Sequence, residues 1–154
     1  MLGIEPFEID IPLRFINPLV LRDREEILAR EQAAEKLGVD SHKKTCILAY
    51  SGHPGDFERV KNRYSYLESE YQMVYTTTYD NGIFPIMDYY NAADFVVCGA
   101  GYNSFWEVVY LEKEALVVPT RARFESGERR IEECGEHCFE RNGADQLVDL
   151  ILDL

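Results

Sequence analysis

The sequence has no apolar run that approaches the ~20 residues needed for a membrane-spanning helix. Its first residues, MLGIEPFEIDIPLRF, are acidic and lack a basic stretch before an apolar one, so we expect no secretory signal and a cytoplasmic protein. Basic residues are few, because 16 Lys and Arg stand against 28 Asp and Glu, a formal net charge of −12. Such a chain repels a phosphate backbone, which argues against nucleic-acid binding.

Motifs for two common kinds of site are also missing. The sequence contains no Gly-Lys-Ser/Thr element of a Walker loop and no Asp-x-Asp motif. Cys46 and Cys98 fall in apolar runs, where a buried thiol packs as a small hydrophobe. Cys134, His137 and Cys138 have helical i, i+3, i+4 spacing, but a structural zinc site needs a fourth ligand and none is evident. We therefore predict no metal site.

Apolar runs alternate along the chain with stretches of helical spacing. The predicted strands are 44–50, 71–77, 94–99 and 115–120. The predicted helices are 22–38, 56–69, a brief one within 82–93, 103–113, 128–138 and 143–154. Because the strands are apolar along their length, helices must cover both faces of the sheet. The sequence therefore predicts an α/β fold, a single Rossmann-like domain with a parallel sheet, over 23–154 after an entry or linker segment at 1–22.

The stretch DFVVCGAGYNSFWEV runs from a strand through two glycines into a helix. Gly99 and Gly101 allow a close approach of the backbone to a ligand. The N–H groups around Asn103 and Ser104, at the start of the helix, suit a diphosphate. Glu107 lies one turn further and can accept hydrogen bonds from two hydroxyls, such as those of a ribose. The alternative is that Glu107 is only a charge favoured by the helix dipole.

A second glycine-rich loop, SGHPG, follows the first predicted strand of the sheet. Ligands of parallel sheets bind outside the carboxyl ends of the strands, so this loop belongs at the same edge as the first. Ser51, Gly52 and Gly55 are candidates to contact a ligand there. His53 is a candidate to bond a phosphate or a sugar hydroxyl, or it is simply an exposed loop residue.

The spacing Gly99-x-Gly101-x-x-Ser104 also approximates a dinucleotide fingerprint. That fingerprint requires an acidic residue at the end of the next strand, which here ends in VPTR. It also normally follows the first strand of the fold, whereas this strand is a late one. We therefore set aside a nicotinamide-dependent oxidoreductase.

The block YYNAADFVVCGAGYNSFWEVVYLEKEALVVP resembles the C-terminal, donor-binding half of two-domain GT-B-type glycosyltransferases. The pattern is most similar to glycosyltransferase family 28, the family of the peptidoglycan N-acetylglucosaminyltransferase group. The shared features are an Ala-Asp pair, an apolar strand, the glycine turn, Ser104, Glu107 and a later strand ending at Pro119. The SGHPG loop and the segment INPLV resemble the family's first glycine-rich loop and its entry segment, so that the resemblance covers about 16–140.

This resemblance implies a nucleotide-sugar donor, most often a UDP-sugar, whose sugar (a hexose) is transferred to an acceptor hydroxyl by an inverting reaction without a metal or other cofactor. It implies that Glu107 binds the ribose hydroxyls and that Gly101 and Ser104 line the diphosphate. Family members often carry a glutamine that contacts the sugar. Its nearest match here is Glu128, which lacks the two amide donors. His53 is a candidate catalytic base, although the acceptor-binding half is a better source of one.

The acceptor-binding half of such enzymes has no counterpart in these 154 residues. We expect that a further domain or a separate subunit supplies it, that the chain is inactive without it, and that any membrane association comes through that partner. The alternative is a non-catalytic Rossmann-like nucleotide-binding or interaction module. In that case FINPLV, Tyr89, Tyr90 and Trp106 form a contact surface instead of packing in the core.

Overall fold

The computed structural model describes residues 2–7, 10–52, 54–78, 82–120 and 127–153. The strands are β1 (Leu2–Gly3), β2 (Arg14–Phe15), β3 (Thr45–Ala49), β4 (Gln72–Thr76), β5 (Phe95–Gly99) and β6 (Ala115–Val118). The helices are α1 (Arg30–Leu37), α2 (Pro54–Arg63), α3 (Tyr102–Tyr110), α4 (Gly127–Cys134) and α5 (Gly143–Leu152), with 3₁₀ helices η1 (Ser65–Ser69) and η2 (Ile86–Ala92). Within these ranges, no helix combines the length and the apolar character that crossing a bilayer requires.

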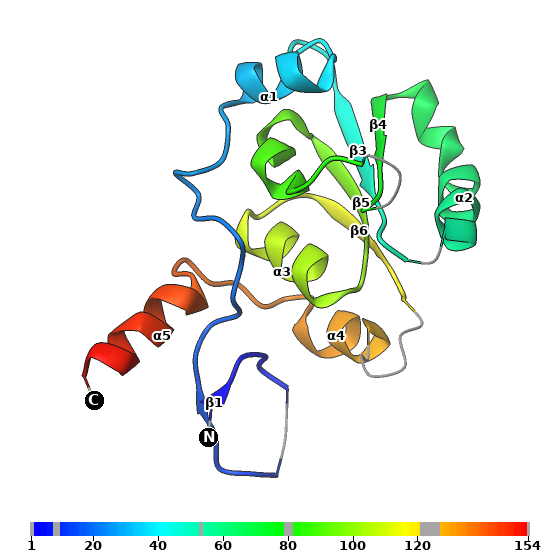
Figure 1. Cartoon of the computed structure of the whole chain (residues 1–154). Helices are drawn as coiled ribbons and strands as arrows, with labels where there is room; N and C mark the ends of the chain where they lie inside the picture. Colours follow the sequence, from blue (N-terminus) through cyan, green and yellow to red (C-terminus); the bar gives the residue numbers. More distant parts are fainter. Residues whose placement is uncertain (1, 8–9, 53, 79–81, 121–126, 154) are drawn as a thin grey trace.

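The predicted α/β fold with a parallel sheet is confirmed. β3 to β6 form one four-stranded parallel sheet in the order β4-β3-β5-β6, and each strand lies within two residues of its predicted bounds. Side chains of β3 alternate between two cores, so Cys46 and Leu48 pack with residues of α2 while Ile47 and Ala49 pack with residues of α3. Figure 1 shows α2 and α3 on opposite sides of the sheet.

The first predicted helix begins later than expected. Helical spacing predicted a start at residue 22, but α1 begins at Arg30. The preceding residues are held by long-range contacts instead, since Arg22 pairs with Asp88 at 3.0 Å and Arg24 donates to the Tyr110 carbonyl at 2.6 Å. The Leu28 N–H donates to the Asp88 carbonyl at 3.0 Å. These contacts hold the segment in an irregular path with a turn at 24–26, and they outweigh a helical preference of a few tenths of a kcal/mol per residue.

The helix predicted at 128–138, which is α4 in the structure, ends earlier than expected. Its early end separates the residues of the hypothetical zinc site. α4 ends at Cys134, four residues before the predicted end, and is followed by Gly135. Cys134 is buried, Cys138 is exposed, and the His137 ring packs edge-on against the indole of Trp106 at 5.6 Å. Among the described residues, no three His, Cys, Asp or Glu side chains are grouped to hold a metal ion.

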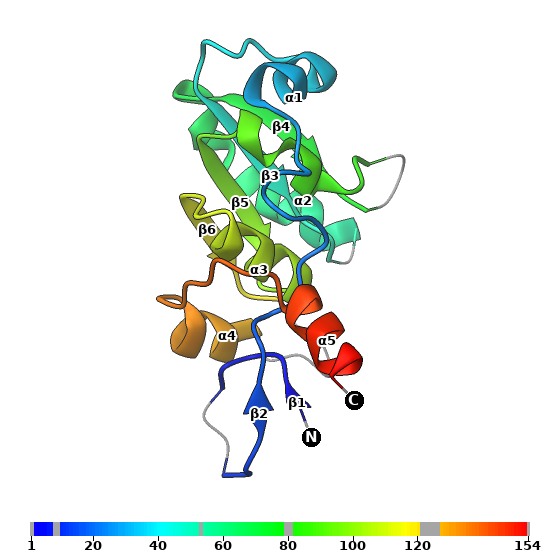
Figure 2. The same cartoon turned by 90° about the vertical axis from the view of Figure 1, so that its left-hand side faces the viewer.

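The residues before β3 pack closely on the sheet domain. Pro18 is fully buried, and its carbonyl accepts a hydrogen bond from the Gly143 N–H at 3.0 Å. A Cβ on Gly143 would lie 1.8 Å from the Asn17 carbonyl oxygen, so this close approach requires glycine. Figure 2 shows the β1–β2 pair, α4 and α5 at the same end of the molecule as both chain termini.

The aromatic residues considered as a contact surface belong mostly to the core. Trp106 and Tyr90 are fully buried, and Trp106 packs against Phe105 and Phe139 with ring centroids 4.9 and 6.0 Å away. Phe15 remains 45% exposed. Core packing therefore explains Trp106 and Tyr90, whereas it does not explain Phe15.

Candidate functional site

A cavity of about 350 Å³ lies at the carboxyl edge of the sheet. It opens where the chain order reverses, because β3 is followed by β4 on one side and is flanked by β5 on the other. Crevices of open α/β sheets bind their ligands at such a switch point. Its volume is within the range of small-molecule sites.

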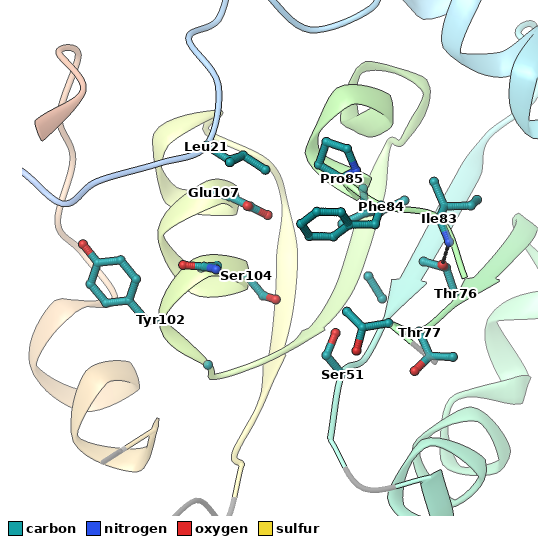
Figure 3. Close-up of a pocket in the computed structure, with 15 residues that line it drawn as sticks. Leu21, Ser51, Thr76, Thr77, Ile83, Phe84, Pro85, Tyr102, Ser104 and Glu107 are labelled. Atoms are coloured by element: carbon teal, nitrogen blue, oxygen red, sulfur yellow. Dashed lines mark hydrogen bonds between the residues drawn. The ribbon is translucent and has the colours of Figure 1, made fainter. Parts of the chain in front are cut away.

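The structure brings five of the residues proposed from the sequence together at this cavity. Figure 3 shows Ser104 and Glu107 on one wall, both from α3, with Ser51 of the loop after β3 on the facing side. Gly101 and Asn103 complete the set. The two glycine-rich stretches, which are about 50 residues apart in the sequence, therefore supply opposite sides of one cavity.

Glu107 is the carboxylate that lines the cavity within the described residues. It is 6% exposed, and no described group donates a hydrogen bond to its carboxylate. Burial, with a smaller contribution from the negative charge of Asp88, raises the pKa of Glu107 to about 7. The carboxylate is therefore strongly desolvated and lacks the donors that a structural carboxylate normally has. It is suited to accept hydrogen bonds from a ligand.

The start of α3 forms the neighbouring part of the wall. Gly101 is the residue before the helix, in an extended conformation, and its carbonyl accepts from the Phe105 N–H at 3.0 Å. The N–H groups of Tyr102, Asn103 and Ser104 precede the first internal helical hydrogen bond, so they are donors for an anion at this position. Asn103 is exposed and Ser104 is half-buried.

The remaining wall was not predicted from the sequence. Besides Ala49 and Tyr102, it consists of Leu21 and of two segments, one at the end of β4 and just after it and one at the start of η2 and just before it, namely Thr76, Thr77, Thr78, Ile83, Phe84, Pro85 and Ile86. The Ile83 N–H donates to the Thr76 hydroxyl at 2.8 Å, which joins the two segments. The run of three threonines at a predicted strand end was the available signal, since hydroxyls at that edge face the ligand site.

Phe84 is the most exposed apolar side chain of this wall. Its ring is 75% exposed, and Figure 3 shows it pointing across the cavity toward Glu107 and Ser104. A large apolar ring in this position has little packing of its own. A flat ligand would bury it.

Two of the proposed glycines lie next to the cavity without lining it. A Cβ on Gly52 would be 2.4 Å from the Tyr50 ring. A Cβ on Gly99 would be 2.9 Å from the Thr120 methyl carbon and 3.3 Å from the same ring. Both glycines therefore make room for Tyr50, which is buried between the two loops.

Three further proposed residues lie elsewhere. Glu128 is exposed at the start of α4 and lines a second hollow of about 590 Å³, together with Tyr50, Asp56, Arg59, Val60, Arg63, Val118 and Pro119. Gly55 lies in the first turn of α2, and its carbonyl accepts from the Arg59 Nε at 3.4 Å. His53 lies outside the described residues.

Comparison with known families gives one match. Residues 17–129 match the model of the glycosyltransferase family 28 C-terminal domain. The matched range contains the four-stranded sheet and every residue that lines the cavity. The searches of curated proteins and of solved structures return no match.

Proposed function

The chain belongs to the glycosyltransferase family 28 C-terminal domain, and we propose that its cavity binds the nucleotide part of a UDP-sugar donor. The observation that carries this proposal is the buried Glu107 carboxylate, which faces the cavity and accepts no hydrogen bond from any described residue. A ribose offers two adjacent hydroxyls, and a carboxylate can accept both. Neighbouring parts of the cavity are then assigned to the diphosphate and to the base.

The diphosphate is assigned to the start of α3. Its N–H groups and the Ser104 hydroxyl are donors, and Gly101 leaves the backbone open to a close ligand. Ser104 precedes Glu107 by one helical turn, so ribose and diphosphate can follow one another along a single helix face. The partial positive charge of the helix N-terminus favours an anion there.

The base is assigned to the wall formed by Phe84 and its neighbours. The exposed ring can stack on a planar heterocycle, while the threonines at the end of β4 offer hydroxyls and backbone groups to the polar edge of the base. We propose uracil as this base, in keeping with the UDP-sugar expected from the sequence.

In this proposal, the domain contributes to transfer by stabilising the leaving group. Negative charge grows on the diphosphate as the glycosidic bond breaks, and fixed donors at a helix N-terminus stabilise that charge. No Asp-x-Asp motif is available for a divalent metal, so we propose that the helix performs this role. The base that activates the acceptor, the acceptor site and any contact with a membrane are assigned to a further domain or a separate subunit. Sugar contacts through Ser51, Gly52, His53, Gly55 or Glu128 remain predictions.

Calorimetry of the chain with UDP, UDP-N-acetylglucosamine, GDP and NAD tests the proposal. We expect the uridine nucleotides to bind, and the isosteric change Glu107→Gln to weaken them at least about tenfold, because an amide accepts on only one atom. Glu132→Gln, on an exposed face of α4, is the matched control and should leave the affinity unchanged. If the folded protein binds none of these nucleotides at millimolar concentration, the proposal is wrong. Binding of NAD alone would instead favour a dinucleotide site.

A further inference from the structure

A buried ion pair contacts the glycine turn, and neither of its two residues lines the cavity. Arg130 of α4 is 3% exposed, and it donates to Glu5 through two nitrogens, with Nε–Oε1 at 2.5 Å and Nη2–Oε2 at 3.1 Å. The Glu5 side chain is 17% exposed. Two charges that are largely shielded from water stabilise each other. Removing one of them leaves the other charge uncompensated, which destabilises the fold.

The third nitrogen of Arg130 reaches the glycine turn itself. Nη1 donates to the Ala100 carbonyl at 2.5 Å, and Ala100 lies between Gly99 and Gly101. The Ala100 N–H donates to the Val118 carbonyl of β6 at 2.8 Å. Both backbone groups of this fully buried residue are therefore fixed, one by the sheet and one by Arg130.

The same guanidinium approaches the first residue of α3. It lies 5.7 Å from the centre of the Tyr102 ring, whose hydroxyl accepts from the Leu19 N–H at 2.8 Å. The start of α4 also packs tightly on the turn, since a Cβ on Gly127 would be 2.9 Å from the Ala100 Cβ. Contacts with α4 and with Leu19 therefore fix the turn and the first residue of α3.

Glu5 is itself fixed by the helix that bears the proposed ribose site. The Trp106 indole N–H donates to Glu5 Oε1 at 2.9 Å, and Trp106 is the neighbour of Glu107 in α3. Nearby, the Arg129 guanidinium lies 4.7 Å from the Phe7 ring. The segment 2–7 is therefore anchored to both α3 and α4.

We propose that Arg130, oriented by Glu5, is a positioning residue that holds the 99–101 turn and the first N–H groups of α3 in place for the donor diphosphate. Arg130 is not among the residues that line the cavity, so its proposed action on the donor is indirect. This inference rests on the proposed function. It adds that a residue near the beginning of the chain is required for tight donor binding.

The test compares UDP with uridine, because uridine lacks the diphosphate and reports on the ribose and base contacts alone. Arg130→Met keeps an unbranched apolar side chain and removes the guanidinium, with the three nitrogens that donate to Glu5 and Ala100. It is expected to lower the Tm, because Glu5 is left without its partner. It is also expected to weaken UDP about tenfold, by the loss of one charge-assisted hydrogen bond to the turn, and to leave uridine within about twofold.

The double variant Glu5→Gln with Arg130→Met separates positioning from stability. Without a carboxylate at residue 5 no unpaired charge remains, so part of the loss in Tm should be recovered, and the amide oxygen of the new side chain can still accept from Trp106. The Ala100 carbonyl still lacks its donor, so UDP should remain about tenfold weaker. Arg130→Lys keeps the charge but lacks the planar guanidinium with its several donors. It is the milder variant to measure if Arg130→Met does not fold. Arg141→Met removes an exposed cation paired with Asp149 and should change neither affinity.

Two results would overturn the inference while leaving the proposed function intact. In one, the affinity for UDP returns together with the Tm in the double variant, which assigns Arg130 a purely structural role. In the other, Arg130→Lys and the double variant weaken uridine as much as UDP. If the unmodified protein binds neither ligand, the proposed function itself fails and this inference fails with it.

Discussion

The negative charge of Asp88 acts on the buried carboxylate of Glu107. Burial is the larger cause of the raised pKa of Glu107, and Asp88 adds to it. Asp88 is itself paired with Arg22 at 3.0 Å, and its side chain is 25% exposed. The proposed ribose site therefore contains a carboxylate that changes its charge near neutral pH.

The affinity for UDP should accordingly depend on pH. In the proposed site, ribose hydroxyls donate to the charged form of Glu107, so binding should strengthen as the pH rises through about 7, the pKa of Glu107, and then reach a plateau. Below that pKa we expect a loss approaching about tenfold per pH unit. Calorimetry between pH 5.5 and 8.5 measures this, and Glu107→Gln should give a flatter profile. A variant with the same slope as the unmodified protein would contradict the assignment.

The stability of the protein should show the opposite trend. Because the pKa of Glu107 in the folded protein lies above its value of 4.5 in the unfolded chain, this group stabilises the fold below pH 4.5, and the contribution is lost as the pH rises through about 7. Relative to the unmodified protein, Glu107→Gln should therefore gain stability with rising pH, by up to about 3 kcal/mol at pH 8. Denaturant unfolding at pH 4.5 and pH 8 checks this. Equal differences at both pH values would argue against a strongly raised pKa.

Phe84→Ala should weaken ligand binding without destabilising the fold. The ring is 75% exposed, so its removal costs little packing, whereas a lost stacking contact with a base corresponds to about tenfold or more in affinity. Tyr66→Ala, at an exposed aromatic residue of η1, is the matched control. UDP titrations and thermal unfolding of the two variants give the comparison. If Phe84→Ala leaves the affinity unchanged, the base does not lie against this ring.

Asn142→Ala should destabilise the protein by about 2 kcal/mol or more. The Asn142 amide accepts from the Ala144 N–H as the cap of α5, and it pairs with both backbone groups of Val20 at 3.2 and 3.1 Å. Gln146→Ala removes a single hydrogen bond, to the Asn17 N–H, and should cost less. Urea unfolding provides both values. Similar losses for the two variants would show that the Val20 contacts contribute little.

The strands could be predicted closely because their signal is local. TCILA, FVVCG and ALVV are apolar along their length, and a strand covered on both faces has that pattern. The start of α1 could not be predicted in the same way. The residues from 22 to 29 have helical spacing, but Asp88 and Tyr110, more than 60 positions away, hold them in an irregular path that contains a turn. A single sequence gives no indication of such partners.

The proposed site likewise has one wall that could be predicted from local sequence and one that could not. The wall from α3 was predicted, because a glycine turn followed by a helix carries its chemistry in consecutive residues. The wall at 83–86 was missed, since nothing local shows that this loop returns over the sheet edge. The hydrogen bond from Ile83 to Thr76 and the packing of η2 determine where it lies.

The position of Trp106 has a practical consequence. It is the one tryptophan of the sequence, it is fully buried, and its indole N–H is bonded to Glu5. Its fluorescence emission is therefore a label-free optical probe of whether segment 2–7 is docked. Detachment of that segment would admit water to the indole and shift the emission to longer wavelength, even while the sheet stays folded.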